Sequence, residues 1–369
     1  MSSIGNLTLA PAAPAMLAPS AARAAERPWM IGPGIDLPLF LGVTLLTLIP
    51  WVVSDVLHYP GWYVILGVGV VNGPHLISTW TRTYLVPGER FKRPVRYWVI
   101  PGVAMAFAIL ADATGGLPLR LARSMIFYWA TWHFVAQSWG VMRIYQRKHA
   151  AAERLEARLE KALIFLPAFF CALHRLFTGP WELFGVEVIH VRPPALLVNG
   201  LGALIVALAV GYLYVWITFG KQRPGYEWVR PAYLGFNFLG FAMPFLVIRD
   251  GNSAFGAAAL WHAVQYMAIV WLYNDRRYRG GVDPKARLVS WASQRGRPLA
   301  YMALIGVCAA VVYVVAFGVS FFVHRPFMDI ALTFWTGFTL GHYYLDGVIW
   351  KSRRYDLRTL TTNAPAPAV

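Results

Sequence analysis

Charged residues are scarce in this sequence of 369 residues, because Asp, Glu, Lys and Arg together make up only 14% of it. A soluble domain carries about 25% of such residues, so this scarcity excludes an ordinary soluble globular protein. Hydrophobic residues instead make up 58% of the chain and gather in long runs that are nearly free of charge. Each run approaches the roughly 20 residues that cross a bilayer as a helix. The composition therefore predicts an all-α, polytopic membrane helical bundle.

Cysteine is also nearly absent, since Cys171 and Cys308 are the only two in the chain. Both lie within apolar runs, which excludes a disulfide framework and a cysteine-based zinc motif and predicts two buried thiols. The chain likewise carries no phosphate-binding loop, dinucleotide fingerprint, HExxH or G-x-S-x-G motif in a fitting context. No common soluble-enzyme motif is therefore available to explain its function.

The apolar runs predict ten membrane spans, and the positions of the basic residues test this number. The spans cover about 37–57, 61–86, 95–112, 119–146, 161–178, 194–219, 231–249, 254–274, 298–323 and 327–350. Lys and Arg concentrate after the even-numbered spans, whereas the other connections carry few. Basic loops face the cytoplasm, so this alternation places both termini there, in a bacterial-type inner membrane. The net charge of +16 then serves anionic lipid headgroups, and no nucleic-acid partner is expected.

The segments outside the spans are short. Residues 1–30 are rich in Ala and Pro and bury little, so they are expected to form a disordered cytoplasmic tail. Residues 31–352 form the membrane domain, and residues 353–369 form a cytoplasmic C-terminal tail. The charged stretch ERLEARLEK, at residues 153–161, is expected to form a short surface helix between the fourth and fifth spans.

Four of the predicted spans contain a histidine, a group that hydrocarbon solvates poorly and that usually faces the bundle interior. The four are His75, His133, His262 and His342, in the second, fourth, eighth and tenth spans. Each has a polar neighbour three or four residues away on the same helical face, such as Gln137, Tyr266 or Asp346. Such a neighbour could hold one imidazole nitrogen and leave the other for a ligand, as partners of metal-bound histidines do.

The depth of these histidines in the bilayer is similar. All four spans run in the same direction, and roughly 9 to 15 residues separate each histidine from its basic flank, at about 1.5 Å per residue. The four rings are therefore expected near the midplane, where they can converge on one point. The simpler interpretation of each histidine alone is a packing residue hydrogen-bonded to a backbone carbonyl.

A site of four neutral imidazoles suits Fe, Cu or Zn, and open coordination positions suit redox chemistry. The apolar surroundings favour a hydrophobic or lipid substrate that enters from the bilayer together with dioxygen. The sequence thus predicts a membrane oxygenase or oxidase that uses a transition metal, foremost Fe(II). In this hypothesis the four histidines are metal ligands, while Tyr266, Gln137 and Asp346 orient them or handle protons.

Four short stretches, one in each histidine-bearing span, carry a family resemblance. They are Pro74-His75, His133-Phe134, the helix around His262, and the closing His342-x-x-x-Asp346. In order and local pattern they resemble the microbial membrane β-carotene 15,15′-dioxygenases, which form retinal. The resemblance implies a multi-helix protein that holds iron with four histidines and cleaves a polyene with dioxygen. One departure is that the family pattern has two histidines four residues apart on one helix, whereas Tyr266 follows His262 here.

Three other classes of function are compatible with the same residues. In a transporter the histidines would form a pathway for protons or metal ions, although the spans show no clear inverted repeat. A haem protein would use two of the histidines as axial ligands, but two stacked haems would need histidines at two depths. A structural or interaction role would need none of this chemistry.

Overall fold

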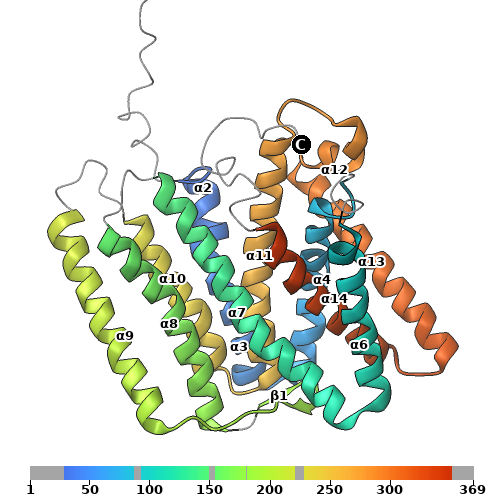
Figure 1. Cartoon of the computed structure of the whole chain (residues 1–369), viewed down its shortest axis with the longest axis horizontal. Coiled ribbons are helices and arrows are strands. Elements are labelled where there is room, and N and C mark those ends of the chain that lie inside the picture. Colours follow the sequence, from blue (N-terminus) through green and yellow to red (C-terminus); the bar gives the residue numbers. More distant parts are fainter. Residues whose placement is uncertain (1–28, 87–92, 149–153, 180, 221–227, 351–369) are drawn as a thin grey trace, which may run out of the picture.

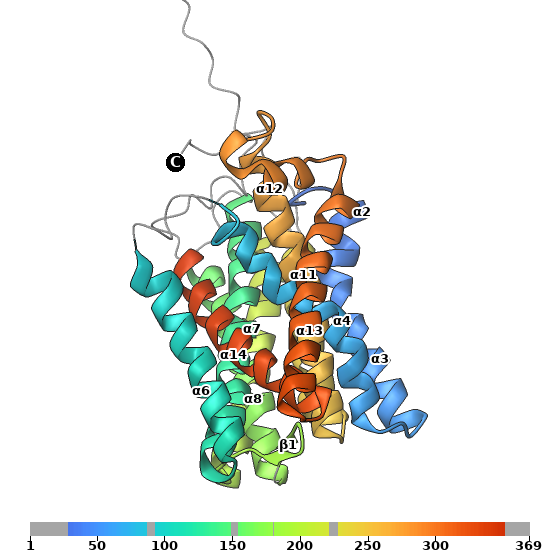
Figure 2. The ribbon, with the colours of Figure 1, turned by 90° about the vertical axis from the view of Figure 1, so that its right-hand side faces the viewer.

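The computed structural model describes residues 29–86, 93–148, 154–179, 181–220 and 228–350. Within these residues the chain forms ten helical segments that run up and down one bundle (Figures 1 and 2). The first segment consists of five consecutive short elements, α2 Pro33–Asp36, η1 Leu37–Leu41, η2 Gly42–Thr47, α3 Leu48–Trp51 and η3 Val52–Val56. The next four are α4 Gly61–Ser78 with η4 Thr79–Arg82, η5 Val95–Val99 with α6 Ile100–Thr114, α7 Gly116–Lys148, and α8 Arg154–Thr178. The second five are α9 Ala195–Val215 with η6 Trp216–Gly220, α10 Val229–Ala242 with η7 Met243–Val247, α11 Gly251–Arg277, α13 Pro298–Val323 and α14 Phe327–Ile349.

The remaining elements are small. The strands β1 Glu182–Leu183 and β2 Val186–Glu187 form a short antiparallel hairpin between α8 and α9. The short helices η8 Pro284–Ala286 and α12 Arg287–Ala292 lie between α11 and α13. The prediction of an all-α membrane bundle is thus confirmed, and each of the ten predicted spans has a helical counterpart.

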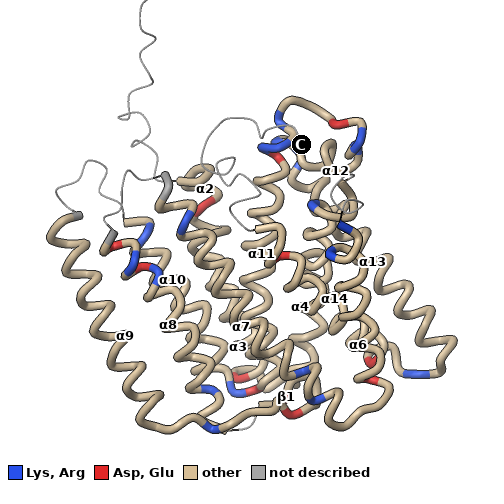
Figure 3. Tube along the Cα trace, viewed as in Figure 1, with Lys and Arg blue, Asp and Glu red and all other residues tan. Residues whose placement is uncertain are grey.

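Six of the helical segments are long and apolar enough to cross a membrane, and five of these six are buried only along one side. The exception is α11, where 83% of the most apolar window is buried inside the protein. Both views place α11 in the middle of the bundle, with α4, α7 and α14 around it (Figures 1 and 2). Lys, Arg, Asp and Glu lie mainly toward the two ends of the helices (Figure 3). An apolar middle with charged ends is the pattern that a bilayer requires.

Local sequence explains where several helices begin and end. The Asp250 side chain accepts a hydrogen bond from the backbone N–H of Ser253 at 2.7 Å and so caps the start of α11. Pro194 and Pro326 precede α9 and α14, where a missing N–H costs nothing. Gly115 turns the chain from α6 into α7 at φ +64° and ψ −153°, a region that only glycine populates readily.

The structure corrects two predicted boundaries. Trp29 and Met30, assigned to the N-terminal tail, pack onto the hydrophobic core, and Met30 is only 2% exposed. The stretch from residue 154 to 161, expected as a separate surface helix, is the first part of α8. Most of the predicted N-terminal tail (residues 1–28) and the whole predicted C-terminal tail (353–369) lie outside the described residues.

The charged residues at the start of α8 can belong to the same helix as its apolar part, because two of their carboxylates have a buried partner. Arg230 on α10 pairs with Glu156 at 3.2 Å and with Glu160 at 2.5 Å, and all three side chains are almost fully buried. Glu160 also accepts hydrogen bonds from Gln146 on α7 at 2.6 Å and from Tyr212 on α9 at 3.1 Å. This cluster therefore ties four helices together at one end of the bundle.

Replacing Arg230 by Met is expected to destabilise the protein by about 3–5 kcal/mol, because it leaves two buried carboxylates without their cation. The matched control is Arg120→Met, which removes a half-exposed pair with Glu187 at 3.7 Å and should cost at most about 1 kcal/mol. Unfolding in mixed detergent micelles, followed by circular dichroism, measures both. Equal losses of stability in the two variants would show that the Arg230 cluster is not a structural tie.

Candidate metal centre

The four histidines of the predicted site lie on the four helices at the centre of the bundle. His75 is on α4, His133 on α7, His262 on α11 and His342 on α14, and all four are at most 7% exposed. α11 packs closely against α4, while α14 packs against both α4 and α7. The helices that the sequence could not show to be neighbours are therefore adjacent.

The four imidazole rings form a closed square. The ring centroid of His75 lies 4.9 Å from that of His262 and 4.6 Å from that of His342. The centroid of His133 lies 4.8 Å from His262 and 4.9 Å from His342. One nitrogen of each ring lies within 4.8 Å of a nitrogen of every other ring. Imidazole nitrogens bind a transition metal at about 2.1 Å, so four nitrogens this close together could share one ion after a small contraction of the square.

The imidazole nitrogens of the square are mostly without hydrogen bonds among the described residues. The unpaired atoms are His75 Nδ1, His133 Nε2, His262 Nδ1, His262 Nε2 and His342 Nε2. Each buried polar atom left unpaired destabilises a fold by about 1–3 kcal/mol. Five such atoms together would cost as much as the roughly 5–15 kcal/mol by which a native fold is stable. A core histidine that only fills space would normally find a backbone carbonyl. The nitrogens of this square instead face one another.

A polar network adjoins the square from the side of Asp346. One carboxylate oxygen, Oδ1, accepts hydrogen bonds from the Tyr266 hydroxyl at 2.5 Å and from Thr79 Oγ1 at 3.1 Å. The other, Oδ2, lies 3.7 Å from His133 Nε2 and 3.6 Å from His342 Nε2. Thr79 Oγ1 also lies 2.8 Å from His342 Nδ1. Asp346 therefore links two rings of the square to a hydroxyl pair.

The expectation that a neighbour on the same helix could hold each ring does not apply to Gln137 and Tyr266. Gln137 does not contact the His133 ring but donates to the backbone carbonyl of His262 at 3.2 Å and to Gln265 Oε1 at 3.1 Å. Tyr266 bonds Asp346 on another helix rather than the ring of His262. Only His342 and Asp346 meet as expected, at 3.6 Å within α14. Side chains in a tight bundle reach across to the next helix as easily as along their own, which the one-turn spacing does not reveal.

Thr79, four residues from His75 and one of the polar neighbours expected to hold that ring, was not among the predicted catalytic residues. It lies directly after α4, one turn beyond His75, and its hydroxyl is within hydrogen-bonding distance of His342, Tyr266 and Asp346. Its position on the face of His75 was a usable signal, since a hydroxyl there points to the same interior as the ring.

Arg82 is a group that the sequence analysis missed, at the end of the network that is predicted to face the cytoplasm. Its guanidinium carbon lies 3.9 Å from the ring centroid of Tyr273 and 4.1 Å from that of Trp350. The Trp350 indole N–H donates to the Tyr266 hydroxyl at 3.3 Å. A series of contacts therefore leads from the predicted cytoplasmic end to Asp346. Its first member is Arg82, whose guanidinium is stabilised by two aromatic faces.

Aromatic rings enclose the other side of the square. The Phe134 ring lies 4.3 Å from His262, and the Tyr343 ring lies 4.5 Å from His133. Both rings also line a small cavity of about 20 Å³, here called the inner cavity, which is just large enough for one water molecule. Its lining residues are Asn72, Leu76, Ile126, Phe134, Phe184, Phe255, Ala259, Trp335, Thr339 and Tyr343. The square thus has a polar side and an apolar side.

Comparison with known proteins adds no relative, since no protein family, curated protein or solved structure matches this chain. The argument for function therefore rests on the residues and their geometry.

Proposed function

We propose that this protein is an integral membrane oxidoreductase, a non-haem metal-dependent oxygenase or oxidase that acts on a hydrophobic substrate dissolved in the bilayer. The observation that carries the proposal is the square of four buried imidazoles, five of whose nitrogens have no hydrogen-bond partner among the described residues. Metal ligation is the ordinary way to satisfy such nitrogens in a dry interior.

The square would hold the metal through His75, His133, His262 and His342. Fe(II) in an all-nitrogen site with open positions supplies dioxygen activation, and imidazole ligands suit it. The surrounding side chains then have distinct tasks. Asp346 places a carboxylate oxygen 3.6–3.7 Å from Nε2 of His133 and His342, the nitrogens that would hold the metal, Tyr266 carries a proton on the hydroxyl that bonds Asp346 Oδ1, and Thr79 holds His342 Nδ1. The Phe134 and Tyr343 rings exclude water from the apolar side.

The membrane orientation belongs to the same proposal. Ten helical segments cross the bilayer, with both termini on the cytoplasmic side of a bacterial-type inner membrane. Its support is the even number of segments and the basic residues that follow the even-numbered ones. The square then lies within the membrane, from which lipid-soluble substrates and dioxygen would reach it.

Two alternatives fit the geometry less well. A transporter needs a polar path on both sides of its binding site, whereas the lining of the inner cavity is mainly apolar and offers only Asn72 and Thr339 beside its aromatic and aliphatic side chains. A haem needs a wide slot between two histidines, whereas ring centroids 4.6 to 4.9 Å apart around the square leave no such slot. The one-sided polarity instead suits an enzyme that takes an apolar substrate from the outer half of the membrane and protons from the cytoplasm.

The proposal is tested with purified protein loaded with Fe(II) in nanodiscs. β-Carotene, chosen because of the family resemblance, and a total bacterial lipid extract serve as separate substrates. We expect dioxygen uptake with at least one of them, and mass spectrometry should show ¹⁸O from labelled dioxygen in the product, or in water for an oxidase. The control is His133→Ala, which should show neither.

Two results would contradict the proposal. Dioxygen uptake that is equal in wild type and His133→Ala would place the chemistry elsewhere. Flux of protons or metal ions through proteoliposomes, abolished by His133→Ala and without any converted substrate, would favour the transporter.

A further inference from the structure

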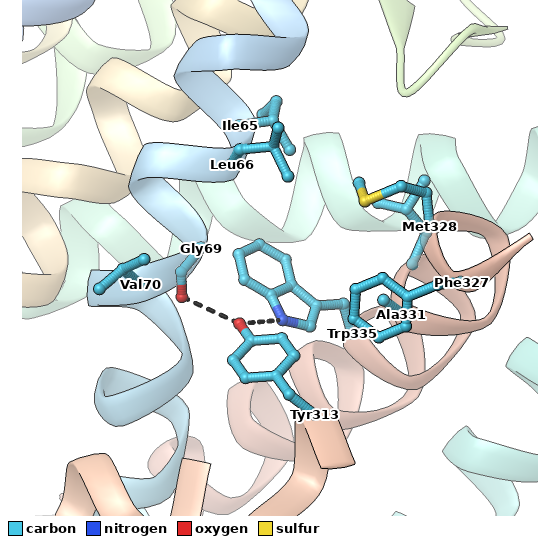
Figure 4. A pocket seen from close by; sticks show the side chains of 10 residues that line it. Ile65, Leu66, Gly69, Val70, Tyr313, Phe327, Met328, Ala331 and Trp335 are labelled. Carbon is cyan, nitrogen blue, oxygen red and sulfur yellow. Dashed lines mark hydrogen bonds between the residues drawn. The ribbon is translucent and has the colours of Figure 1, made fainter. Parts of the chain in front are cut away.

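A second, larger cavity opens near the inner cavity, between α4, α13 and α14. It has a volume of about 220 Å³ and is here called the lateral groove (Figure 4). Its lining residues are Ile65, Leu66, Gly69, Val70, Tyr313, Phe327, Met328, Ala331, Leu332 and Trp335. Val70 is 74% exposed and Leu66 is 52% exposed, on a surface that faces lipid in the proposed orientation. The groove is therefore accessible from the bilayer.

Trp335 separates this groove from the histidine square. It lines the lateral groove and also lines the inner cavity, whose walls include Phe134 and Tyr343 beside the histidines. Both cavities lie between helices that carry histidines of the square. Gly69 precedes His75 by six residues on α4, and Trp335 precedes His342 by seven residues on α14, so the groove lies roughly 10 Å from the rings along the helix axes.

A hydrogen-bonded pair holds the Trp335 ring in place. The Trp335 indole N–H donates to the Tyr313 hydroxyl at 2.9 Å, and that hydroxyl donates to the backbone carbonyl of Gly69 at 2.9 Å (Figure 4). Glycine at position 73 leaves room for this arrangement, because a Cβ there would lie only 3.0 Å from the Tyr313 hydroxyl. The only polar side-chain atoms of the groove are thereby already bonded to one another.

The lining of the groove defines what it can bind. All side chains other than Tyr313 and Trp335 are aliphatic or aromatic, and no charged residue is among them. A volume of about 220 Å³ is less than the roughly 300–1,000 Å³ of a site that encloses a whole small molecule. The groove therefore suits one part of an elongated hydrocarbon, while the rest extends into the lipid or toward the square.

We infer that the lateral groove is the route by which an elongated hydrocarbon chain reaches the histidine square from the bilayer, and that Trp335 is its gate. This inference rests on the proposed function for its purpose. The inner cavity of about 20 Å³ is too small for a chain, so the Trp335 ring must swing away from Tyr313 before the chain can enter. Trp335 thereby selects slender chains over bulky ones.

The test uses two photoreactive probes in nanodiscs, with mapping of the labelled residues by mass spectrometry. One is a 16-carbon alcohol with a terminal diazirine, and the other is the same chain ending in the bulkier adamantyl diazirine. In wild type we expect the slender probe, and not the bulky one, to label the inner-cavity residues Leu76 and Thr339. Trp335→Ala should raise slender labelling at these residues roughly fivefold and should admit the bulky probe.

Tyr313→Phe provides a milder variant, because it keeps the ring of Trp335 and removes only its hydrogen-bond partner. Labelling of Leu76 and Thr339 by the slender probe should rise roughly fivefold at most, the effect of one hydrogen bond of ordinary strength. The matched control is Trp98→Ala, which removes a half-exposed tryptophan on η5 and should change nothing at the inner cavity.

Equal inner labelling in Trp335→Ala, Tyr313→Phe and Trp98→Ala would overturn the gate, provided that all three variants melt as wild type does. The same labelling is repeated on wild-type protein stripped of metal by a chelator, which should leave it unchanged because the route does not depend on the metal. Failure of the route with a metal-loaded, active protein refutes this inference alone. A labelled route in a protein that never binds metal refutes the proposed function alone.

Discussion

Replacing His262 by Ala is expected to abolish metal binding. Wild-type protein purified in detergent after expression with iron should contain close to one transition-metal ion per chain, and the variant should contain less than roughly a tenth of that. The physical reason is that His262 is the most buried of the four histidines at 1% exposure, and neither of its nitrogens has another partner among the described residues. Elemental analysis by inductively coupled plasma mass spectrometry measures the effect.

The matched control for this loss is His174→Ala. His174 is a half-buried histidine that, like His262, has an unpaired Nδ1, but it lies on α8 beside Phe170 and outside the square. Its removal should leave the metal content unchanged. The same metal content in wild type and His262→Ala, or a metal-free wild type after loading with Fe(II), Cu(II) and Zn(II) in turn, would contradict the square as a metal site.

Removing the metal should also change the stability of wild type and of His262→Ala differently. A chelator is expected to lower the melting temperature of wild type, because an ion held at 1,000 times its dissociation constant contributes about 4 kcal/mol to the folded state. His262→Ala should show no such response, since it has no ion to lose. A packing histidine would behave differently, because its loss would lower stability equally with and without the chelator.

The sequence predicted which histidines form the site but not which helices lie next to one another. The four histidines could be found because ionisable groups are costly in a hydrocarbon span, and their common depth followed from the alternation of basic loops. Neither signal reports which helices are neighbours. The packing of α11 against α4, and of α14 against α4 and α7, depends on side-chain shape along whole helices, which a pattern of single residues does not contain.

The same limit explains the errors at particular residues. Gln137 and Tyr266 were assigned to the rings one turn away, but both side chains bond to another helix. Glu156 and Glu160 were taken for surface residues because carboxylates are rarely buried unpaired, and their partner Arg230 lies about 70 residues further along the chain. A long-range ion pair can invert a prediction from local composition.

Replacing Asp346 by Asn is expected to weaken metal binding by roughly 10- to 100-fold and to reduce turnover further, by about 100- to 10,000-fold. The carboxylate accepts from Tyr266 and Thr79 on one oxygen and faces His133 and His342 with the other. The amide of Asn supplies an N–H on one of these two sides. This N–H would either donate to an imidazole lone pair that the metal needs or face the Tyr266 and Thr79 hydroxyls, which are themselves donors. In both cases one side of the network is lost.

Tyr266→Phe distinguishes the proton-handling role from the positioning of the rings. It removes the hydroxyl 2.5 Å from Asp346 Oδ1 but leaves the carboxylate facing His133 and His342, so metal content should stay near that of wild type while kcat falls and KM stays constant. Asp112→Asn serves as the control for carboxylate loss, because Asp112 pairs with Arg325 at the outer end of α6. A loss of metal in Tyr266→Phe as large as in Asp346→Asn would show that the hydroxyl only positions the rings. Full turnover in both variants would remove the network from the chemistry altogether.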